Sequence, residues 1–149
     1  MSYNATVYNV MAASPSDVSA ERIIIRDVIY EWNTINSISK NIVLLPIGWE
    51  THSSPEMEDS PQNIINKQVL NKSDVVVGVF WTRIGTPTTE YQSGTVEEIE
   101  KHIQSGKLTM LYFSSRPVEQ DSVDQAQYEE LKKSKSPADL VVFTKVMMI

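Results

Sequence analysis

The chain has 149 residues, enough for one domain that buries a hydrophobic core. It is 41% hydrophobic and 21% charged, and no apolar run approaches the roughly 20 residues of a membrane helix, so we expect no membrane span. The formal charge of -6 argues against nucleic acid as a partner, because binding to the phosphate backbone depends on clustered Lys and Arg. The absence of cysteine and of a signal-peptide pattern at the N-terminus predicts a cytoplasmic location.

The first two predicted elements are a strand and a long amphipathic helix. Thr6 to Ala13 is typical of a buried strand. Ser14-Pro15-Ser16-Asp17 supplies an N-cap serine, a proline at the first helical position and an acid at the third, which predicts a helix that runs to about Trp32. The apolar residues at helical spacing are assigned to its buried face: Val18, Ile25, Val28, Ile29 and Trp32. Charged residues are assigned to the solvent side: Glu21, Arg22, Arg26 and Glu31.

The middle of the chain continues the alternation of strands and helices. Ile42 to Trp49 predicts a second strand, in which Pro46 indicates an edge position or a bulge. Ser60-Pro61 repeats the serine-proline start and opens a helix that runs to Leu70. The almost wholly apolar run Asp74 to Trp81 predicts a strand that is buried on both faces of the sheet.

The last predicted elements complete the pattern. Thr95 to Gln104 predicts a helix that Gly106 ends, followed by a strand at Leu108 to Phe113 and a helix at Ser122 to Lys133. Regular alternation of strand and helix predicts an α/β fold, a three-layer sandwich with a parallel sheet of four to five strands flanked by helices.

Parallel sheets of this kind bind ligands beyond the carboxyl ends of their strands, where the strand order reverses. The loops after the first three strands are therefore the predicted site: Ser14 to Asp17, Glu50 to Ser53, and Thr82 to Thr95.

Glu98 is the predicted catalytic residue. It lies one turn into a helix that begins at this edge of the sheet, where a carboxylate can attack or stabilise an anomeric carbon with oxocarbenium character. A structural alternative remains open, because Thr95 and Glu98 also have the spacing of a capping box, in which each side chain bonds the backbone N–H of the other.

Three further side chains are candidates for binding a substrate. His52 follows the second strand directly, but a single loop histidine is also typical of a solvated surface, and we expect no metal site. Arg83 can hold a phosphate or carboxylate and Trp81 can stack on a base. Alternatively, Trp81 belongs to the core and Arg83 pairs with an acid such as Glu50 or Glu90.

Several segments resemble a bacterial domain of unknown function that often stands at the N-terminus of larger signalling or defence proteins. The resemblance covers most of residues 5 to 133. The segments that carry it are Val10-Met11-Ala12-Ala13-Ser14-Pro15-Ser16-Asp17-Val18 with Glu21-Arg22, Trp49-Glu50-Thr51-His52-Ser53-Ser54-Pro55-Glu56-Met57, Ile64-Ile65-Asn66-Lys67-Gln68, Phe80-Trp81-Thr82-Arg83-Ile84-Gly85-Thr86-Pro87 and Ser93-Gly94-Thr95-Val96-Glu97-Glu98.

The resemblance implies a fold similar to nucleoside 2-deoxyribosyltransferases and TIR domains. In the transferases a Gly-Thr-x-x-Glu helix start carries the nucleophilic glutamate, and this pattern falls on Gly94, Thr95 and Glu98. The chain has Gln92 where the transferases commonly carry an aspartate, which puts nucleoside specificity in doubt. The substrate-binding residues expected from these motifs and loops are Ser14, Asp17, Glu50, His52, Trp81, Arg83, Ser93, Gly94 and Thr95.

Three functions follow as hypotheses. The first is an enzyme that hydrolyses or transfers an N-glycosidic bond of NAD, a nucleoside or a nucleotide, with NAD as a substrate and no bound cofactor. The second is a non-catalytic, TIR-like module that self-associates or docks on a signalling NTPase. The third is a sensor that binds a nucleotide without cleaving it.

The C-terminal tail departs from the pattern of the resembled family. Family members usually continue with a Gly-Leu-Tyr-Glu-like stretch, which permissible codons for Val141 onward encode in a neighbouring reading frame. We therefore hypothesise that a frameshift replaced the C-terminus from about residue 134 and truncated a longer protein. The alternative is a genuine fifth strand from Leu140 to Val146, which its β-branched content favours.

Overall fold

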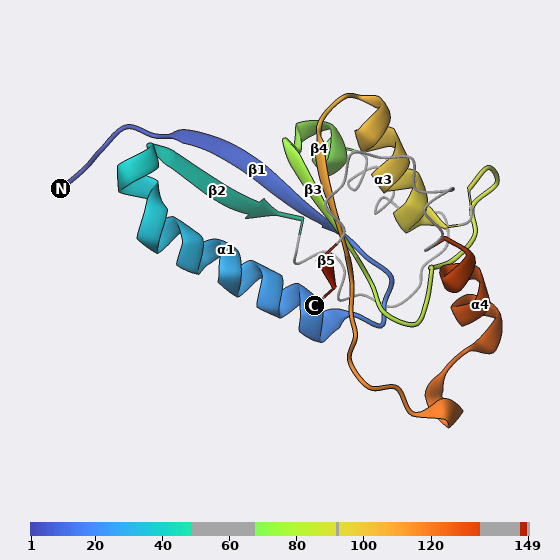
Figure 1. Cartoon of the computed structure of the whole chain (residues 1–149). Helices are drawn as coiled ribbons and strands as arrows, with labels where there is room; N and C mark the ends of the chain where they lie inside the picture. Colours follow the sequence, from blue (N-terminus) through green and yellow to red (C-terminus); the bar gives the residue numbers. More distant parts are fainter. Residues whose placement is uncertain (49–67, 92, 135–146, 149) are drawn as a thin grey trace.

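The computed structural model describes residues 1–48, 68–91, 93–134 and 147–148 (Figure 1). Within them a single parallel sheet has the strand order β2-β1-β3-β4-β5. The strands are β1 (Thr6–Ala13), β2 (Ile42–Ile47), β3 (Val75–Phe80), β4 (Leu108–Phe113) and β5 (Met147–Met148). This order is that of a flavodoxin-like, doubly wound sheet, and it confirms the predicted α/β class.

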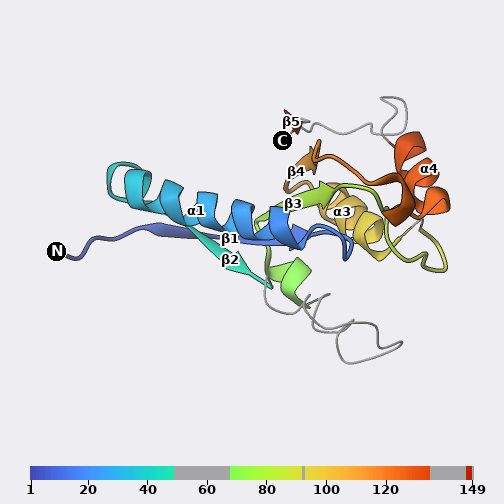
Figure 2. The ribbon, with the colours of Figure 1, turned by 90° about the horizontal axis from the view of Figure 1, so that it is seen from below.

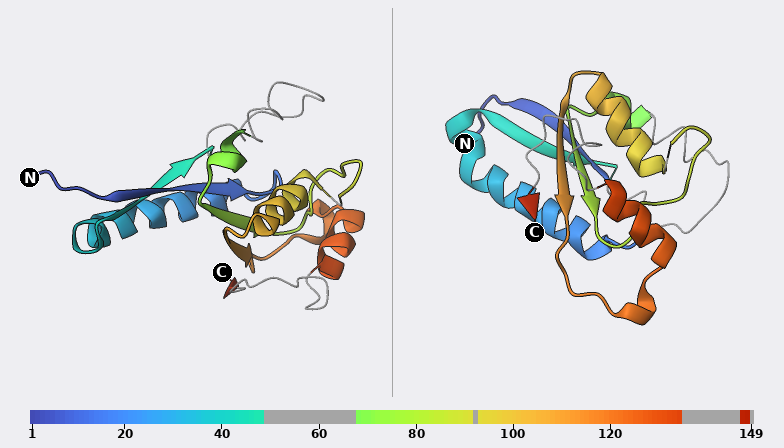
Figure 3. Two further views of the ribbon diagram at one scale, coloured as in Figure 1. Left: turned by 90° about the horizontal axis from the view of Figure 1, so that it is seen from above. Right: turned by 45° about the vertical axis from the view of Figure 1, so that its right-hand side comes forward.

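Helices cover both faces of the sheet. Helix α1 (Ser19–Lys40) lies along β1 and β2, whereas α3 (Gly94–Gln104) and α4 (Gln125–Ser134) lie on the other side of the molecule (Figures 2 and 3). A short 3-10 turn (Gln120–Ser122) precedes α4. Two hydrophobic clusters form the core. The cluster under α1 contains Val10, Val18, Ile29, Val77 and Val79, and that under α3 and α4 includes Met11, Val76, Ile99, Leu111 and Leu131.

The start of α1 differs from the prediction. The helix begins at Ser19 rather than at Pro15, its N-cap is Val18, and it continues to Lys40 rather than ending near Trp32. Ser14 does not cap the helix, because its hydroxyl accepts a hydrogen bond from Arg22 instead. The polar segment before α1 therefore contacts the Arg22 side chain and, through Asp17, the backbone of Thr82, instead of capping the helix.

The predicted buried face of α1 is partly wrong. Val18 and Ile29 are buried as predicted, but Val28 is 56% exposed. Glu21 and Arg22, assigned to solvent, are buried at 5% and 8% exposure. The cause is helical geometry: Arg22 lies four residues after Val18 and three before Ile25, so all three share one face whatever their polarity.

The other elements agree closely with their predictions. Pro46 lies in β2, which is an edge strand of the sheet. Gly106 follows α3 with φ of +77°, as a helix-terminating glycine requires. The helix α4 begins at Gln125, three residues later than predicted, where the Asp124 carboxylate accepts from the Gln127 N–H. Residues 68–72 are helical and include the predicted helix end at Leu70.

Two predicted segments cannot be compared with the structure. The predicted fifth strand from Leu140 to Val146 lies outside the described residues, although the short β5 pairs with Tyr112 and Phe113 of β4 just after it. Residues 60–67 of the predicted second helix also lie outside them. Among the helices that the structure describes, none has the length and apolar character needed to cross a bilayer.

Gly78, in the middle of β3, allows α3 to pack closely on the sheet. A Cβ at this position would lie 2.5 Å from Leu111 Cδ2 and 2.7 Å from Ile99 Cδ1. We expect Gly78→Ala to lower the free energy of unfolding by about 1 to 3 kcal/mol, as overpacking of a close-packed core does. Urea denaturation measures this loss, and Gly94→Ala is the matched control because its Cβ meets nothing nearer than 4.0 Å.

Candidate functional site

The candidate site lies at the carboxyl edge of the sheet, where the strand order reverses between β1 and β3. The chain leaves β1 toward α1 on one face, and it leaves β3 toward α3 on the other. The loops after these two strands therefore diverge, and this is the position where doubly wound sheets bind ligands. Side chains of both helices and both loops contribute to this edge.

Arg22 links the two faces of the sheet at this edge. Its guanidinium donates a buried hydrogen bond of 2.8 Å from Nη1 to Ser14 Oγ, at the end of β1. It also interacts electrostatically with Glu98 of α3. Burial lowers the pKa of Arg22 to about 10, and the Glu98 carboxylate opposes this shift. Arg22 is therefore still charged at neutral pH, and α1 and α3 place opposite charges at this edge of the sheet.

Glu98 has an acidity unlike that of a surface carboxylate. The pKa of Glu98 is raised from 4.5 to about 7, mainly by burial and also by the neighbouring charge of Glu97, while Arg22 opposes the shift. Its side chain nevertheless keeps some solvent exposure. A group with a pKa near neutrality is present in both protonation states at physiological pH, as an acid-base or nucleophilic residue requires.

The alternative role of Glu98 in a capping box with Thr95 is wrong. The N-cap of α3 is Ser93, whose Oγ accepts from Val96 N at 3.1 Å, so the helix begins before Thr95. Thr95 is instead a buried residue of the first turn. Gly94 is the first helical residue. The Ser93 hydroxyl thus stabilises the helix start and leaves Glu98 for another role.

Asp17 ties the loop after β1 to the loop after β3. Its Oδ2 accepts two hydrogen bonds from Thr82, one from the backbone N–H at 3.0 Å and one from Oγ1 at 2.8 Å. The other oxygen, Oδ1, is buried and makes no hydrogen bond in the described part of the chain. One carboxylate oxygen therefore fixes the loops, and the second can accept from a donor that the described residues do not supply.

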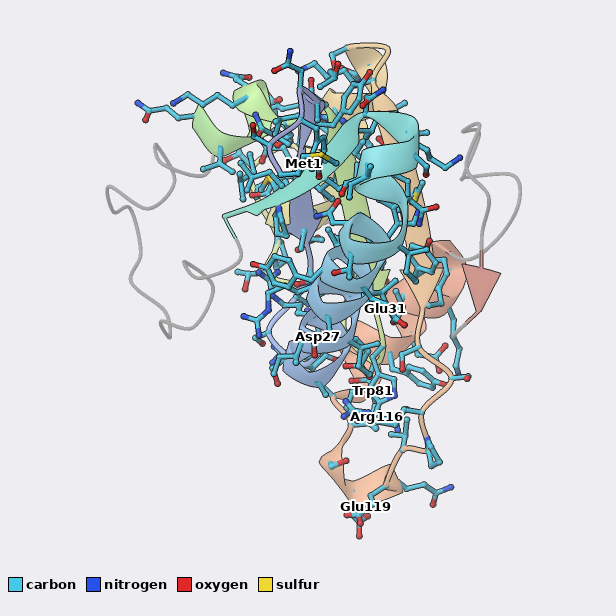
Figure 4. The ribbon with its side chains drawn as sticks, turned by 90° about the vertical axis from the view of Figure 1, so that its left-hand side faces the viewer. Met1, Asp27, Glu31, Trp81, Arg116 and Glu119 are labelled. Carbon is cyan, nitrogen blue, oxygen red and sulfur yellow. The ribbon has the colours of Figure 1, made fainter. Side chains whose placement is uncertain are left out.

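A second cluster joins α1 to the loop after β4. Arg116 Nε lies 3.2 Å from Glu21 Oε1, which also accepts from Ser114 Oγ at 2.9 Å. The Arg116 guanidinium lies 3.6 Å from the centre of the Trp81 ring, and Trp81 Nε1 donates to the Arg116 carbonyl at 3.0 Å. Trp81 and Arg116 lie side by side near the N-terminal end of α1 (Figure 4). Trp81 is thus covered on one ring face by a cation.

The chain was compared with known proteins. The model of the family described as "Domain of unknown function (DUF4062)" matches residues 13–144. The chain belongs to this family. A search of curated proteins finds no match. Among solved structures, the chain is similar to a conserved protein from Enterococcus faecalis V583, with a TM-score of 0.44 and 12% identity over 90% of this chain and 78% of that one.

The structure of this DUF4062 domain brings most of the predicted site residues to one edge. The predicted residues found there are Ser14, Asp17, Trp81, Arg83, Ser93, Gly94, Thr95 and Glu98. Glu50 and His52 lie outside the described residues, as does Gln92. The pairing of Arg83 with Glu50 is therefore untested, and Arg83 Nε is buried with no hydrogen-bond partner within the described residues.

Three residues of the site were missed by the predictions. Glu21 and Arg22 were assigned to solvent, and Arg116 was not singled out. A signal for Arg22 was available, because its spacing from Val18 and Ile25 places it on the buried face. Among the residues that the structure describes, no three His, Cys, Asp or Glu side chains are grouped to hold a metal ion.

Proposed function

We propose that this domain hydrolyses or transfers an N-glycosidic bond of NAD, a nucleoside or a nucleotide. The observation that carries the proposal is the position of Glu98: a partly buried carboxylate with a pKa near 7, at the point where the strand order reverses, facing a buried arginine. Such a carboxylate suits chemistry at an anomeric carbon, where positive charge develops as the base departs.

In the proposed reaction the C–N bond between sugar and base breaks, and its electron pair leaves with the base. The Glu98 carboxylate stabilises the developing oxocarbenium ion or bonds to the anomeric carbon. Water or an acceptor nucleophile then takes the place of the base. Arg22 favours the ionised form of Glu98, because its positive charge opposes the effect of burial on the pKa.

The surrounding groups suit the other parts of such a substrate. Asp17 Oδ1 is a buried acceptor to which no described residue donates, and a ribose hydroxyl group can supply that donor. Arg83 Nε is a buried donor that meets no acceptor among the described residues, and it suits a phosphate oxygen. We assign the base to the region of Trp81, whose ring already binds a cation on one face. We also propose that the protein acts in the cytoplasm, in signalling or defence.

Incubation with NAD, AMP, adenosine and deoxyadenosine, followed by chromatography of the released base, tests this function. We expect base release by the unmodified protein and none by Glu98→Gln. Glu100→Gln is the matched control, because Glu100 lies on the same helix and is exposed. Turnover that persists in Glu98→Gln, or a complete lack of base release from all four compounds, would overturn the proposal.

A second candidate function, a non-catalytic interaction module, is favoured by the outer face of α1. Four aliphatic side chains at helical spacing are each more than half exposed there: Ile24, Val28, Ile35 and Ile38. Exposed aliphatic stripes of this kind mark surfaces that bind other proteins. This function predicts assembly with another copy or with a signalling NTPase.

Light scattering over a range of protein concentrations tests the interaction module. If it self-associates, the apparent mass rises with concentration, and Ile35→Glu prevents the rise because it places a charge in the aliphatic stripe. Thr34→Glu is the control, since Thr34 is an exposed polar residue of the same helix. A constant monomer mass would exclude self-association.

A further inference from the structure

The side chain of Gln127 occupies a turn that is built to hold an oxygen atom. Gln127 Oε1 accepts hydrogen bonds from two consecutive backbone N–H groups of the loop after β3, Ile84 at 3.1 Å and Gly85 at 3.0 Å. Gly85 has φ of +110°, a conformation that favours glycine. Consecutive N–H groups that converge on one point form a concave site for anionic oxygens, and here the oxygen comes from a neutral amide on α4.

The surroundings of this turn favour negative charge. An added Cβ on Gly85 would lie 3.0 Å from Ser93 Cβ and 3.6 Å from Thr95 Oγ1, so the turn lies against the N-cap and first turn of α3. The N-terminus of this eleven-residue helix carries partial positive charge. Arg83 directly precedes the turn, and its buried Nε makes no hydrogen bond to any described residue. The two backbone donors therefore lie beside a helix terminus, and an arginine with a buried donor precedes them directly in the sequence.

We propose that the turn at Ile84 and Gly85 binds one oxygen of a phosphate group, and that Gln127 is its intramolecular substitute. A phosphate oxygen in this position receives charge-assisted hydrogen bonds, which are about twice as strong as those to a neutral amide. Binding and the Gln127 contact are then mutually exclusive. Because Leu131 anchors α4 in the core at 1% exposure, only the Gln127 side chain has to leave.

The inference concerns binding and stands apart from the proposed reaction. If the phosphate site and the proposed reaction are both correct, the substrate is a nucleotide rather than a nucleoside. The turn lies in the loop after β3, and Glu98 lies in α3, which follows that loop. A failure of base release would leave the phosphate site untouched, because its test has no catalytic readout.

Titration of the full chain with inorganic phosphate, followed by NMR or calorimetry, tests the proposal. We expect Gln127→Ala to bind phosphate at least tenfold more tightly than the unmodified chain, because the competing amide is gone. Gln125→Ala is the matched control, since Gln125 is an exposed residue of the same helix. Arg83→Gln, added to Gln127→Ala, is expected to remove most of the gain. The same titration with acetate shows whether the turn also binds a carboxylate. Titrations with AMP and with adenosine are compared to show whether the site binds the phosphate of a nucleotide.

A second variant keeps the test decisive if Gln127→Ala does not fold. Gln127→Glu places a tethered carboxylate in the turn, so we expect a higher Tm and no phosphate binding. Equal phosphate affinity in Gln127→Ala and the unmodified chain would overturn the proposal. A Gln127→Glu variant that is destabilised would also overturn it, because a turn that favours anions stabilises the carboxylate.

Discussion

Glu98→Gln is expected to lower turnover at least about a thousandfold and, in the same variant, to raise the free energy of unfolding above pH 7 by about 3 kcal/mol. Both effects come from the same cause. The ionised carboxylate is held in a place where burial disfavours it, because burial raises its pKa from 4.5 to about 7. Glutamine keeps the shape of the side chain without the charge.

The pH dependence of this gain has a defined sign. The folded protein keeps the Glu98 proton up to about pH 7, whereas the unfolded chain releases it near pH 4.5. The contribution of Glu98 to the free energy of unfolding is therefore fully present below pH 4.5, and it is lost as the pH rises from 4.5 through 7. The Gln variant has no such loss, so the difference in unfolding free energy grows between pH 4.5 and 7 and is constant above.

Urea denaturation at pH 5, 6, 7 and 8 measures the difference for Glu98→Gln and for the exposed control Glu100→Gln. The control is expected to follow the unmodified protein at every pH. A Glu98→Gln variant that is less stable than the unmodified protein at pH 8 would mean that the carboxylate is a structural group. A gain in stability with loss of turnover is the combination expected of a functional residue.

The strands were predicted well because their signal is local. Thr6–Ala13 and Leu108–Phe113 form with the predicted bounds, since the residues that favour strands are neighbours in the sequence. The prediction that the first strand is buried is only half right, because Val7 is 52% exposed and burial begins at Val10. The run Val75–Phe80 was predicted within one residue at each end for the same reason. The class of the fold follows from the order of such segments along the chain.

The helix starts and the site were predicted less well because they depend on distant partners. Ser14 and Asp17 have the sequence of a helix start, yet they bond Arg22 and Thr82. The Thr82 contact spans 65 positions of the sequence, and no local pattern specifies it. Similarly, hydrophobicity assigns Arg22 to solvent, although the helix geometry buries it opposite Glu98.

The buried charges at the carboxyl edge have a common consequence for the fold. Glu21, Arg22 and Glu98 are removed from water in different degrees, and Glu21 Oε2 and Asp17 Oδ1 lack hydrogen bonds within the described residues. Such groups lower stability unless a ligand satisfies them. The three buried or partly buried charges come from α1 and α3, and two of them, Arg22 and Glu98, interact at the edge where ligands bind in such sheets, which favours a binding site over a purely structural network.

Arg22→Met is expected to lower the free energy of unfolding by a few kcal/mol at pH 8, because two groups lose their contact with the guanidinium. Methionine fills a similar volume but leaves the Ser14 hydroxyl without its 2.8 Å donor and Glu98 without its opposite charge. Because Arg22 lowers the pKa of Glu98, this pKa is expected to rise above 7 in the variant.

The cost of Arg22→Met therefore depends on pH. At pH 5 Glu98 is protonated and gains little from the guanidinium, so the loss is expected to be smaller than at pH 8 by about 1 to 3 kcal/mol. Urea denaturation at both pH values measures this, with Arg26→Met as the control, since the Arg26 side chain is 41% exposed and lies a long 3.9 Å from the exposed Asp27 carboxylate. An equal loss of unfolding free energy at both pH values would show that Arg22 does not interact with the ionised Glu98 carboxylate. Arg22→Met made in the Glu98→Gln background tests whether the pH dependence comes from this pair. If the loss of unfolding free energy caused by Arg22→Met is then the same at pH 5 and pH 8, its pH-dependent part comes from the interaction between Arg22 and Glu98.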